Sequence, residues 1–307
     1  MSAGTATRDR ETLAQPETAR GTFVLTFDFE DWHQLVNRRL GRPDWRDGSV
    51  DFNRHLASVL DALDDLGVSA TFFVAGVAAD RHPRALREVA SRGHEVACHG
   101  YEHRRVFQQS PAEFREDVVR CADALASICG VTPIGYRAPW FSINKNAVWA
   151  HDILGELGFR YDSSLYDSPF VPERIRPVPA GPFRLAPGPD AELWEFPIAV
   201  WRWGRSVVPI GGGAYWRVFP RAVLLRGLES VARRSTLPVL YFHPYEWAEE
   251  ALRVTLPSPA SPRERIRETS RRLYKNTRRH VIPLRMREAA ERFHLIAFRE
   301  ALGSVRA

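Results

Sequence analysis

Residues 70–98, ATFFVAGVAADRHPRALREVASRGHEVAC, decide the fold class of this chain. The two ends, residues 70–74 and 95–98, are short and largely apolar, as buried strands are. Between them, residues 82–92 favour a helix, and Gly93 stands where a helix end needs a left-handed residue. Strand, helix and strand in succession predict a parallel βα unit.

The same alternation continues on both sides of this unit. Upstream, residues 23–27 predict a strand, a loop rich in Gly, Pro and Asp is expected through Gly48, and a helix runs from about Asp51 to Gly67. Alternation alone fits both an α/β barrel and a doubly wound sheet, and in both the chemistry lies at the carboxyl ends of strands. The elements predicted downstream are a helix at 111–128, a strand ending near Tyr136, a helix at 146–157, a strand at 159–161, a helix at 220–234, and strands at 239–242 and 295–298.

Residues 165–220 break this rhythm, because they are dense in Pro, Gly and Trp. Flexible linkers seldom contain several tryptophans, so we interpret the segment as an ordered insertion packed beside a pocket. Its tryptophans fit sugar stacking and simple packing equally well. The other expected boundaries are a disordered leader at 1–21, a single catalytic domain at 22–300 that includes the insertion, and a tail at 301–307.

The composition excludes several classes of protein. The 307 residues carry a formal net charge of +6, spread along the chain without a nucleic-acid-binding motif, so no nucleic-acid partner is expected. Three cysteines without CxxC spacing argue against a disulfide framework. Because no signal peptide or membrane-spanning apolar run is visible, we expect a cytoplasmic protein without an integral membrane segment, at most peripherally associated with a membrane. No pattern indicates the oligomeric state.

Four strand ends carry residues suited to hydrolytic chemistry. Because the carboxyl ends of parallel strands meet at one edge, we expect these side chains to lie close together. The four are Asp28-Phe29-Glu30-Asp31, His99-Gly100-Tyr101-Glu102-His103, Arg137-Ala138-Pro139-Trp140, and His243 after the strand at 239–242.

The two histidines of the second strand end stand four residues apart. If the chain turns helical at Gly100, His99 and His103 lie on one face and can share a metal ion, with a nearby carboxylate as a third ligand. Structural roles stay open at this point, since the acidic cluster also fits a helix N-cap and a lone histidine such as His243 also fits a packed core. Arg137 fits a partner for the Asp28 carboxylate.

Taken in order, these motifs resemble the polysaccharide deacetylase family (NodB homology, carbohydrate esterase family 4). The likeness covers residues 22–245 and includes one further motif, YDSS at 161–164, while the fourth strand end matches as LYFH at 240–243. The runs PIGGGAYWR at 209–217 and HPYEW at 243–247 resemble a subgroup linked to exopolysaccharide and exosortase-type systems. The resemblance implies a distorted (β/α) barrel of about seven parallel strands, with the Pro/Trp-rich insertion and a helical C-terminal extension.

The resemblance also implies catalytic roles and a cofactor. Asp28 would be the general base and His243 the general acid, with Arg137 orienting the base and Asp162 tuning the acid. A divalent metal ion, most simply zinc, with cobalt and nickel as alternatives, would be held by the residue pair His99 and His103 together with a carboxylate. Backbone N–H groups near 136–140 or 100–103 would stabilise the oxyanion. The side chains or backbone expected to contact substrate are those of Trp140, Tyr136, Gly212 and Trp32.

The carboxylate ligand departs from the family pattern. Many members have two adjacent aspartates, the second of which is a ligand, whereas Phe29 follows Asp28 here. Since side chains alternate along a strand, Glu30 shares a face with Asp28 and is our first choice as ligand. If the chain turns instead, Asp31 is the second choice.

The expected activity is removal of N-acetyl groups from N-acetylated sugars of a surface polysaccharide or its precursor. Two alternatives use the same scaffold: a hydrolase of other amides, such as cyclic ureides or imides, and a non-catalytic carbohydrate-binding protein. The intact set of polar residues argues against the second alternative.

Overall fold

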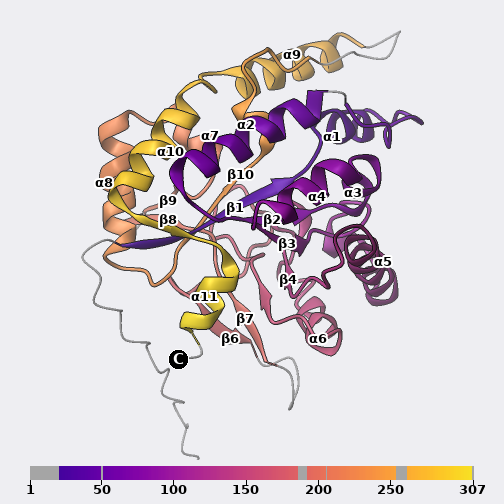
Figure 1. The fold of residues 1–307 in the computed structure, drawn as a ribbon, viewed down its shortest axis with the longest axis horizontal. Coiled ribbons are helices and arrows are strands. Elements are labelled where there is room, and N and C mark those ends of the chain that lie inside the picture. The colour runs from indigo at the N-terminus through magenta and orange to yellow at the C-terminus, as the bar shows by residue number, and fades with distance from the viewer. Residues whose placement is uncertain (1–20, 50, 186–191, 205, 254–260, 306–307) are drawn as a thin grey trace, which may run out of the picture.

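The computed structural model describes residues 21–49, 51–185, 192–204, 206–253 and 261–305, and it shows a curled sheet surrounded by helices (Figure 1). The strands lie in the order β10-β1-β2-β3-β4-β5-β7-β6, with β11 also paired to β1. Their bounds are β1 (Thr22–Phe29), β2 (Thr71–Val74), β3 (Glu95–Cys98), β4 (Gly135–Tyr136), β5 (Tyr161–Asp162), β6 (Phe183–Leu185), β7 (Leu193–Glu195), β10 (Val239–Phe242) and β11 (His294–Ile296).

The seven strands from β10 through β7 are all parallel to their neighbours, and only β6 is antiparallel to β7. Past the end of β7, Ile198 forms a parallel bridge with Val239 of β10, so the chain reaches back to the first strand of the order. The sheet therefore curls into a distorted barrel. This arrangement confirms the predicted fold class and decides against a doubly wound sheet.

Strand β1 shows how the two faces of the sheet are used. Phe23, Leu25 and Phe27 pack in the larger core between the sheet and its helices. Val24 belongs to a second core, with aromatic side chains of β2 and β5, on the other face. Because side chains alternate along a strand, Asp28 lies on the same face as Val24, which is the inside of the barrel.

The helices cover the outside of the barrel (Figure 1). Those predicted from periodicity are present within a few residues of the expected bounds, and α9 and α10 form the expected C-terminal extension. The helices are α1 (Trp32–Arg39), α2 (Asp51–Leu66), α3 (Gly76–Arg81), α4 (Pro83–Ser91), α5 (Pro111–Cys129), α6 (Trp149–Glu156), α7 (Gly213–Val218), α8 (Arg221–Ala232), α9 (Pro262–Asn276), α10 (Val281–Arg292) and α11 (Phe298–Ser304). No helix in the described parts of the chain is long and apolar enough to cross a bilayer.

One segment differs from the sequence-based expectations, and the structure adds detail to two others. The loop expected before Gly48 is wrong over 32–39, which form α1 behind an Asp31 N-cap. The segment 165–220, interpreted as an ordered insertion, supplies β6 and β7 to the main sheet and forms a separate hairpin of β8 (Val200–Trp203) and β9 (Ser206–Pro209). Most of the predicted tail lies in α11, whereas the predicted leader, residue 21 aside, lies outside the described residues.

Candidate functional site

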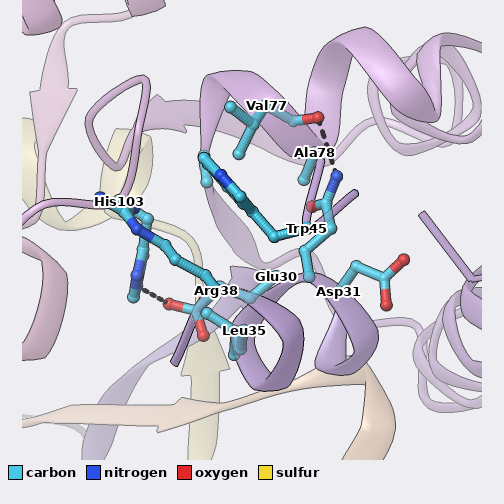
Figure 2. A pocket seen from close by; sticks show the side chains of 10 residues that line it. Glu30, Asp31, Leu35, Arg38, Trp45, Val77, Ala78 and His103 are labelled. Carbon is cyan, nitrogen blue, oxygen red and sulfur yellow. Dashed lines mark hydrogen bonds and ion pairs between the residues drawn. The ribbon is translucent and has the colours of Figure 1, made fainter. Parts of the chain in front are cut away.

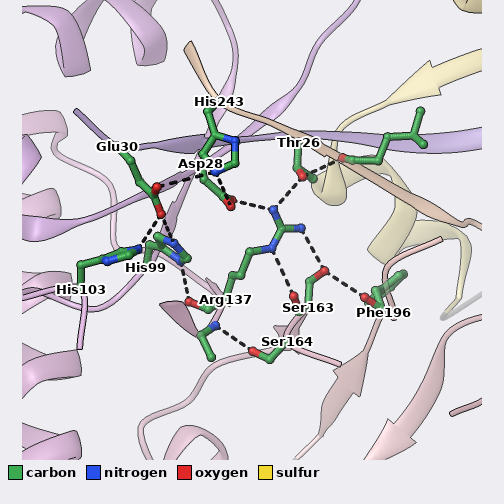
Figure 3. Close-up of polar contacts among 12 residues, drawn as sticks. Thr26, Asp28, Glu30, His99, His103, Arg137, Ser163, Ser164, Phe196 and His243 are labelled. Carbon is green, nitrogen blue, oxygen red and sulfur yellow. Dashed lines mark hydrogen bonds and ion pairs between the residues drawn. The ribbon is translucent and has the colours of Figure 1, made fainter. Parts of the chain in front are cut away.

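The predicted strand ends meet at one place inside the rim of the barrel (Figure 3). Asp28 is the penultimate residue of β1 and Glu30 follows the strand, His99 follows β3, Arg137 follows β4, and His243 follows β10. All five side chains are at least largely buried, and His243 is the most exposed, with 16% of its side chain accessible. The strand register therefore assembles the polar groups that the motifs identified.

Glu30 joins the two histidines. Its Oε1 lies 2.8 Å from Nε2 of His99 and 2.6 Å from Nε2 of His103. Burial opposes ionisation of Glu30, but the two imidazoles outweigh it and hold the pKa of this carboxyl well below its usual range. Burial also dominates at His103, whose pKa is lowered, whereas at His99 the nearby carboxylates of Asp28 and Glu30 overcome burial and raise the pKa.

The segment between the histidines is not the helical turn that the spacing suggested. Gly100 and His103 have φ angles of 71° and 52°, so the backbone twice enters the left-handed region. The Asp117 carboxylate of α5 accepts hydrogen bonds from the N–H groups of Tyr101 (2.7 Å) and Glu102 (3.0 Å) and holds the turn. A side chain at Gly100 would meet Asp117, with a Cβ only 2.8 Å from its Oδ2. Both imidazoles still face Glu30, but an irregular turn brings them there.

Arg137 holds Asp28 in one orientation. Its fully buried guanidinium donates to Oδ1 of Asp28 at 2.7 Å and to the hydroxyl of Thr26 at 2.8 Å. It also donates to the carbonyl and hydroxyl of Ser163, and it lies over the ring of Phe73 at 4.0 Å. A buried guanidinium needs this set of acceptors, and the pairing leaves Oδ2 of Asp28 facing the site.

His243 lies beside Asp28 and Glu30, on the side away from His99 and His103. Its Nε2 is 3.6 Å from Oε2 of Glu30 and 3.9 Å from Oδ2 of Asp28. Its other ring nitrogen, Nδ1, is 3.3 Å from Oε2 of Glu246, which also accepts from the backbone N–H of His243 at 3.0 Å. Asp162, which the sequence suggested for this role, lies elsewhere, and Glu246 was not among the predicted site residues.

Glu246 is held in a buried, positively charged setting. Burial raises the pKa of its carboxyl, but His243, Arg217 and Lys275 outweigh that effect and leave the pKa lowered. Gly213 lies so close that a Cβ there would be 2.4 Å from Oε2 of Glu246. The signal for Glu246 was present in the sequence, because Pro244 after His243 and a glutamate three residues on match a helix start with a capping box.

Asp31 and Asp162 contact other residues. Asp31 caps α1 by accepting from the N–H of His33 at 2.8 Å, and its other oxygen lies 3.1 Å from Nε2 of His82. Asp162 lies in a second buried group, 3.2 Å from Nε2 of His151 and close to the carboxyl group of Glu195. The structure thus brings Glu30, and not Asp31, to the histidine pair.

The second buried group predicts an unusual pH dependence of stability. Burial and the neighbouring Asp162 raise the pKa of Glu195 well above its usual value of 4.5. Above pH 4.5 the unfolded chain has released this proton while the folded chain keeps it, so stability falls as the pH rises toward the folded pKa. Glu195→Gln should therefore unfold at higher urea than wild type near pH 8, with the difference shrinking near pH 5. Equal midpoints at both pH values would contradict this assignment.

The residues expected to contact substrate divide into exposed and buried ones. Trp140 is 52% exposed, and its ring centroid is 5.8 Å from that of His103. Tyr136 and Trp32 are buried, the former against Phe114 and the latter against Tyr245. The backbone of Gly212 forms a bridge with Tyr241 of β10, and a Cβ at Gly212 would meet the Tyr241 ring at 2.7 Å. This glycine therefore lets two backbones approach each other.

The donor set fits a divalent metal ion. One ligand atom each from Glu30, His99 and His103 lie within 4.8 Å of one another. Nδ1 of His99 faces the Arg137 carbonyl at 2.8 Å, which fits an Nδ1–H donor and leaves Nε2 as the ligand atom. Two imidazoles and a carboxylate leave a coordination position open, as catalytic zinc sites do. In a second group, ligand atoms of Asp28, Glu30 and His243 also lie within 4.8 Å of one another, and Glu30 belongs to both groups.

Comparison with known proteins divides the chain into two overlapping halves. Residues 16–161 match the family model described as polysaccharide deacetylase, and residues 151–302 match a domain of unknown function, DUF3473. Curated relatives include the peptidoglycan deacetylase of Helicobacter pylori, 27% identical over 35% of this chain and 36% of that protein. The chitooligosaccharide deacetylase of a Bradyrhizobium strain is 35% identical over 31% of this chain and 42% of that protein. The matched stretch thus spans about two fifths or less of each of these relatives.

Solved structures agree with the fold over nearly the whole chain. A Mycobacterium smegmatis protein assigned to the polysaccharide deacetylases aligns with a TM-score of 0.62 at 23% identity, covering 96% of this chain and 94% of that one. Puue allantoinase aligns with a TM-score of 0.59 at 14% identity, covering 95% and 94%. At these identities the likeness concerns the fold alone. Residues 16–161, just under half of the chain, are thus similar to the polysaccharide deacetylase family, and the sequence relatives and the curled parallel sheet agree with that similarity.

Proposed function

We propose that this protein is a metal-dependent deacetylase that removes N-acetyl groups from N-acetylated sugars of a surface polysaccharide or its precursor. The observation that carries the proposal is the single cluster in which Glu30 joins His99 and His103 while Arg137 holds Asp28 beside them. The match of residues 16–161 to the polysaccharide deacetylase model supports the same activity, as do the names of the curated relatives, a peptidoglycan deacetylase and a chitooligosaccharide deacetylase.

Glu30, His99 and His103 would hold the ion, with zinc as the first expectation and cobalt or nickel as alternatives. When bound, the ion supplies Lewis acidity to the amide carbonyl and lowers the pKa of water. Asp28, with Oδ1 on Arg137, uses Oδ2 to accept the proton of the attacking water. Arg137 keeps this carboxylate oriented, which is a positioning role.

His243 then protonates the leaving nitrogen of the sugar. Its imidazole lies across the acidic pair from the two metal-site histidines, so base and acid face one reacting centre from different strands. Glu246 contacts Nδ1 and the backbone N–H of His243, which orients the ring so that Nε2 faces the site. In this chain we therefore assign to Glu246 the role that the sequence suggested for Asp162.

A substitution at Glu246 tests this positioning role. Glu246→Gln keeps an oxygen that can accept from the His243 N–H but removes the negative charge next to the ring. We expect kcat to fall about tenfold or more with little change in KM, and Glu246→Ala to lose more than Glu246→Gln. Steady-state kinetics on both variants measure the split. Equal loss in the two variants, or a loss confined to KM, would contradict the assignment.

The exopolysaccharide assignment depends on the C-terminal half. DUF3473 covers residues 151–302, which include the PIGGGAYWR and HPYEW runs that resemble the exosortase-linked subgroup. In the structure these two runs meet, because Gly213 packs against Glu246 and Nε of Arg217 lies 3.7 Å from the Glu246 carboxylate. The contact places both runs beside His243, which supports a shared role for them at the site.

Acetate release tests the proposed function. Purified protein with added zinc or cobalt should release acetate from N-acetylhexosamine oligomers. Allantoin and related cyclic amides, assayed in parallel, address the alternative that the allantoinase-like fold leaves open. The exposed Trp140 ring beside the site favours an extended sugar substrate over a small enclosed one. Hydrolysis of the cyclic amides without acetate release from sugars would contradict the deacetylase proposal.

A further inference from the structure

Two arginines flank His103 without a carboxylate partner among the described residues. Arg38 of α1 lines the small cavity next to Glu30 and His103, and its side chain runs beside the His103 ring (Figure 2). Its Nη1 is buried without a hydrogen-bond acceptor. On the other side, the guanidinium of Arg105 lies over the Trp140 ring at 5.2 Å, and Trp140 in turn lies against His103.

Neighbouring arginines are paired, which makes these two stand out. Arg46 contacts Glu102 at 2.5 Å, and Arg104 contacts Glu113 at 3.2 Å. Glu102 and Glu113 are thus paired with arginines other than the two that flank His103. Arg38 and Arg105 form no such ion pair among the described residues, so both guanidinium groups can offer positive charge to an anionic ligand.

Arg105 and Trp140 line a groove large enough for part of a sugar residue. The cavity measures about 120 Å³, and its walls include Phe107, Phe141 and Phe170. Phe170 is 76% exposed and Trp140 is 52% exposed. Large aromatic rings that stay open to solvent around a hollow are typical of binding surfaces, and sugar rings stack on such faces.

The backbone under Trp140 is strained in a way that places this ring. Trp140 and Phe141 have φ angles of 60° and 53°, although both are bulky residues for which the left-handed region is unfavourable. Backbone strain of this kind persists where the surrounding structure enforces it, and it concentrates at functional sites. Here it holds Trp140 between His103 and Arg105, so the order along the groove is histidine pair, aromatic ring, guanidinium.

We propose that this groove binds an anionic group, a carboxylate or a phosphate, located about one sugar ring from the amide that is hydrolysed. Arg105 makes the contact, Trp140 and Phe170 support the sugar ring, and Arg38 adds positive charge at the mouth. The proposal rests on the deacetylase function and specifies its substrate: an acidic glycan, or a sugar attached to a phosphate, in preference to a neutral oligomer.

Three substrates and two variants test this proposal. The substrates are a neutral N-acetylglucosamine tetramer, a hyaluronan tetrasaccharide in which N-acetylglucosamine alternates with glucuronate, and UDP-N-acetylglucosamine, which distinguishes phosphate from carboxylate. We expect kcat/KM about tenfold higher for at least one anionic substrate than for the neutral tetramer, with the advantage shrinking at high salt. Arg105→Gln should bring the anionic substrate down to the level of the neutral one. The matched control Arg104→Gln removes the same charge one residue away and should keep the preference within about twofold.

Binding to the Asp28→Asn protein, measured by calorimetry, separates this proposal from the deacetylase function. The groove proposal is supported if an anionic ligand binds more tightly than a neutral one and Arg105→Gln abolishes this difference. That holds even if the wild type releases no acetate and the proposed function therefore fails. Equal binding of neutral and anionic ligands overturns the groove proposal, whatever the turnover. An equal loss in Arg104→Gln and Arg105→Gln also overturns it, because the preference would then come from overall charge.

Discussion

Replacing Asp28 with asparagine should lower kcat by about three orders of magnitude while leaving the protein folded. Asparagine keeps an oxygen for the Arg137 hydrogen bond at the Oδ1 position, so the buried guanidinium keeps its acceptor. What disappears is the basic oxygen that faces the site. The measurement is acetate release under saturating substrate, with circular dichroism and bound metal content checked on the same sample.

Asp31→Asn is the matched control for this substitution. Asp31 lies three residues away in the same acidic cluster, but its carboxylate caps α1 and contacts His82. Asparagine is as good an N-cap as aspartate, so we expect activity within about threefold of wild type. Comparable losses in Asp28→Asn and Asp31→Asn would remove Asp28 from the role of general base.

Removing the metal ion should abolish the activity, and returning zinc, cobalt or nickel should restore it. The structure makes a sharper prediction about the ligands. Mutating a residue that only supports a metal ligand lowers ion affinity by about 10- to 100-fold. Glu30→Gln should lower it by more, because Glu30 contacts both histidines directly. Asp31→Asn should leave the affinity unchanged. Competition with a chromophoric chelator measures both constants.

The opposite result is equally informative. If Asp31→Asn weakens the ion and Glu30→Gln does not, the segment after β1 must rearrange on metal binding, and the N-cap of α1 must open to release Asp31. An ion that binds with unchanged affinity to the His103→Ala variant would instead point to the second group, in which Asp28 and His243 share Glu30.

The features that could be predicted from the sequence depend on residues close together in the chain. The run at 70–98 predicts its two strands and the helix between them because apolar periodicity and Gly93 act over a few residues. The site residues were also within reach, because each follows a strand and parallel strands end at the same rim. The pattern of strands and helices could not distinguish a barrel from an open sheet, since the difference depends on a bridge between Ile198 and Val239.

The errors have a common physical origin in contacts between distant segments. The Gly100 turn looked helical by spacing, but its conformation depends on Asp117 of α5, which supplies the acceptor for its backbone. The residues of α1 looked like a loop because Gly41 and Pro43 follow closely, although Asp31 provides a cap. Asp162 looked like the partner of His243 from motif order alone, and only the tertiary structure shows that Glu246 occupies that place.

The pairing of β10 with β1 has a consequence for how activity arises during synthesis. Residues 16–161 carry Asp28, the histidine pair and Arg137, yet His243 is more than two hundred residues downstream of Asp28 and joins it only when β10 docks along β1. In the mechanism that we propose, a nascent chain that has completed its first half would hold the base without the acid. The onset of hydrolysis would then depend on the long-range contact between β10 and β1.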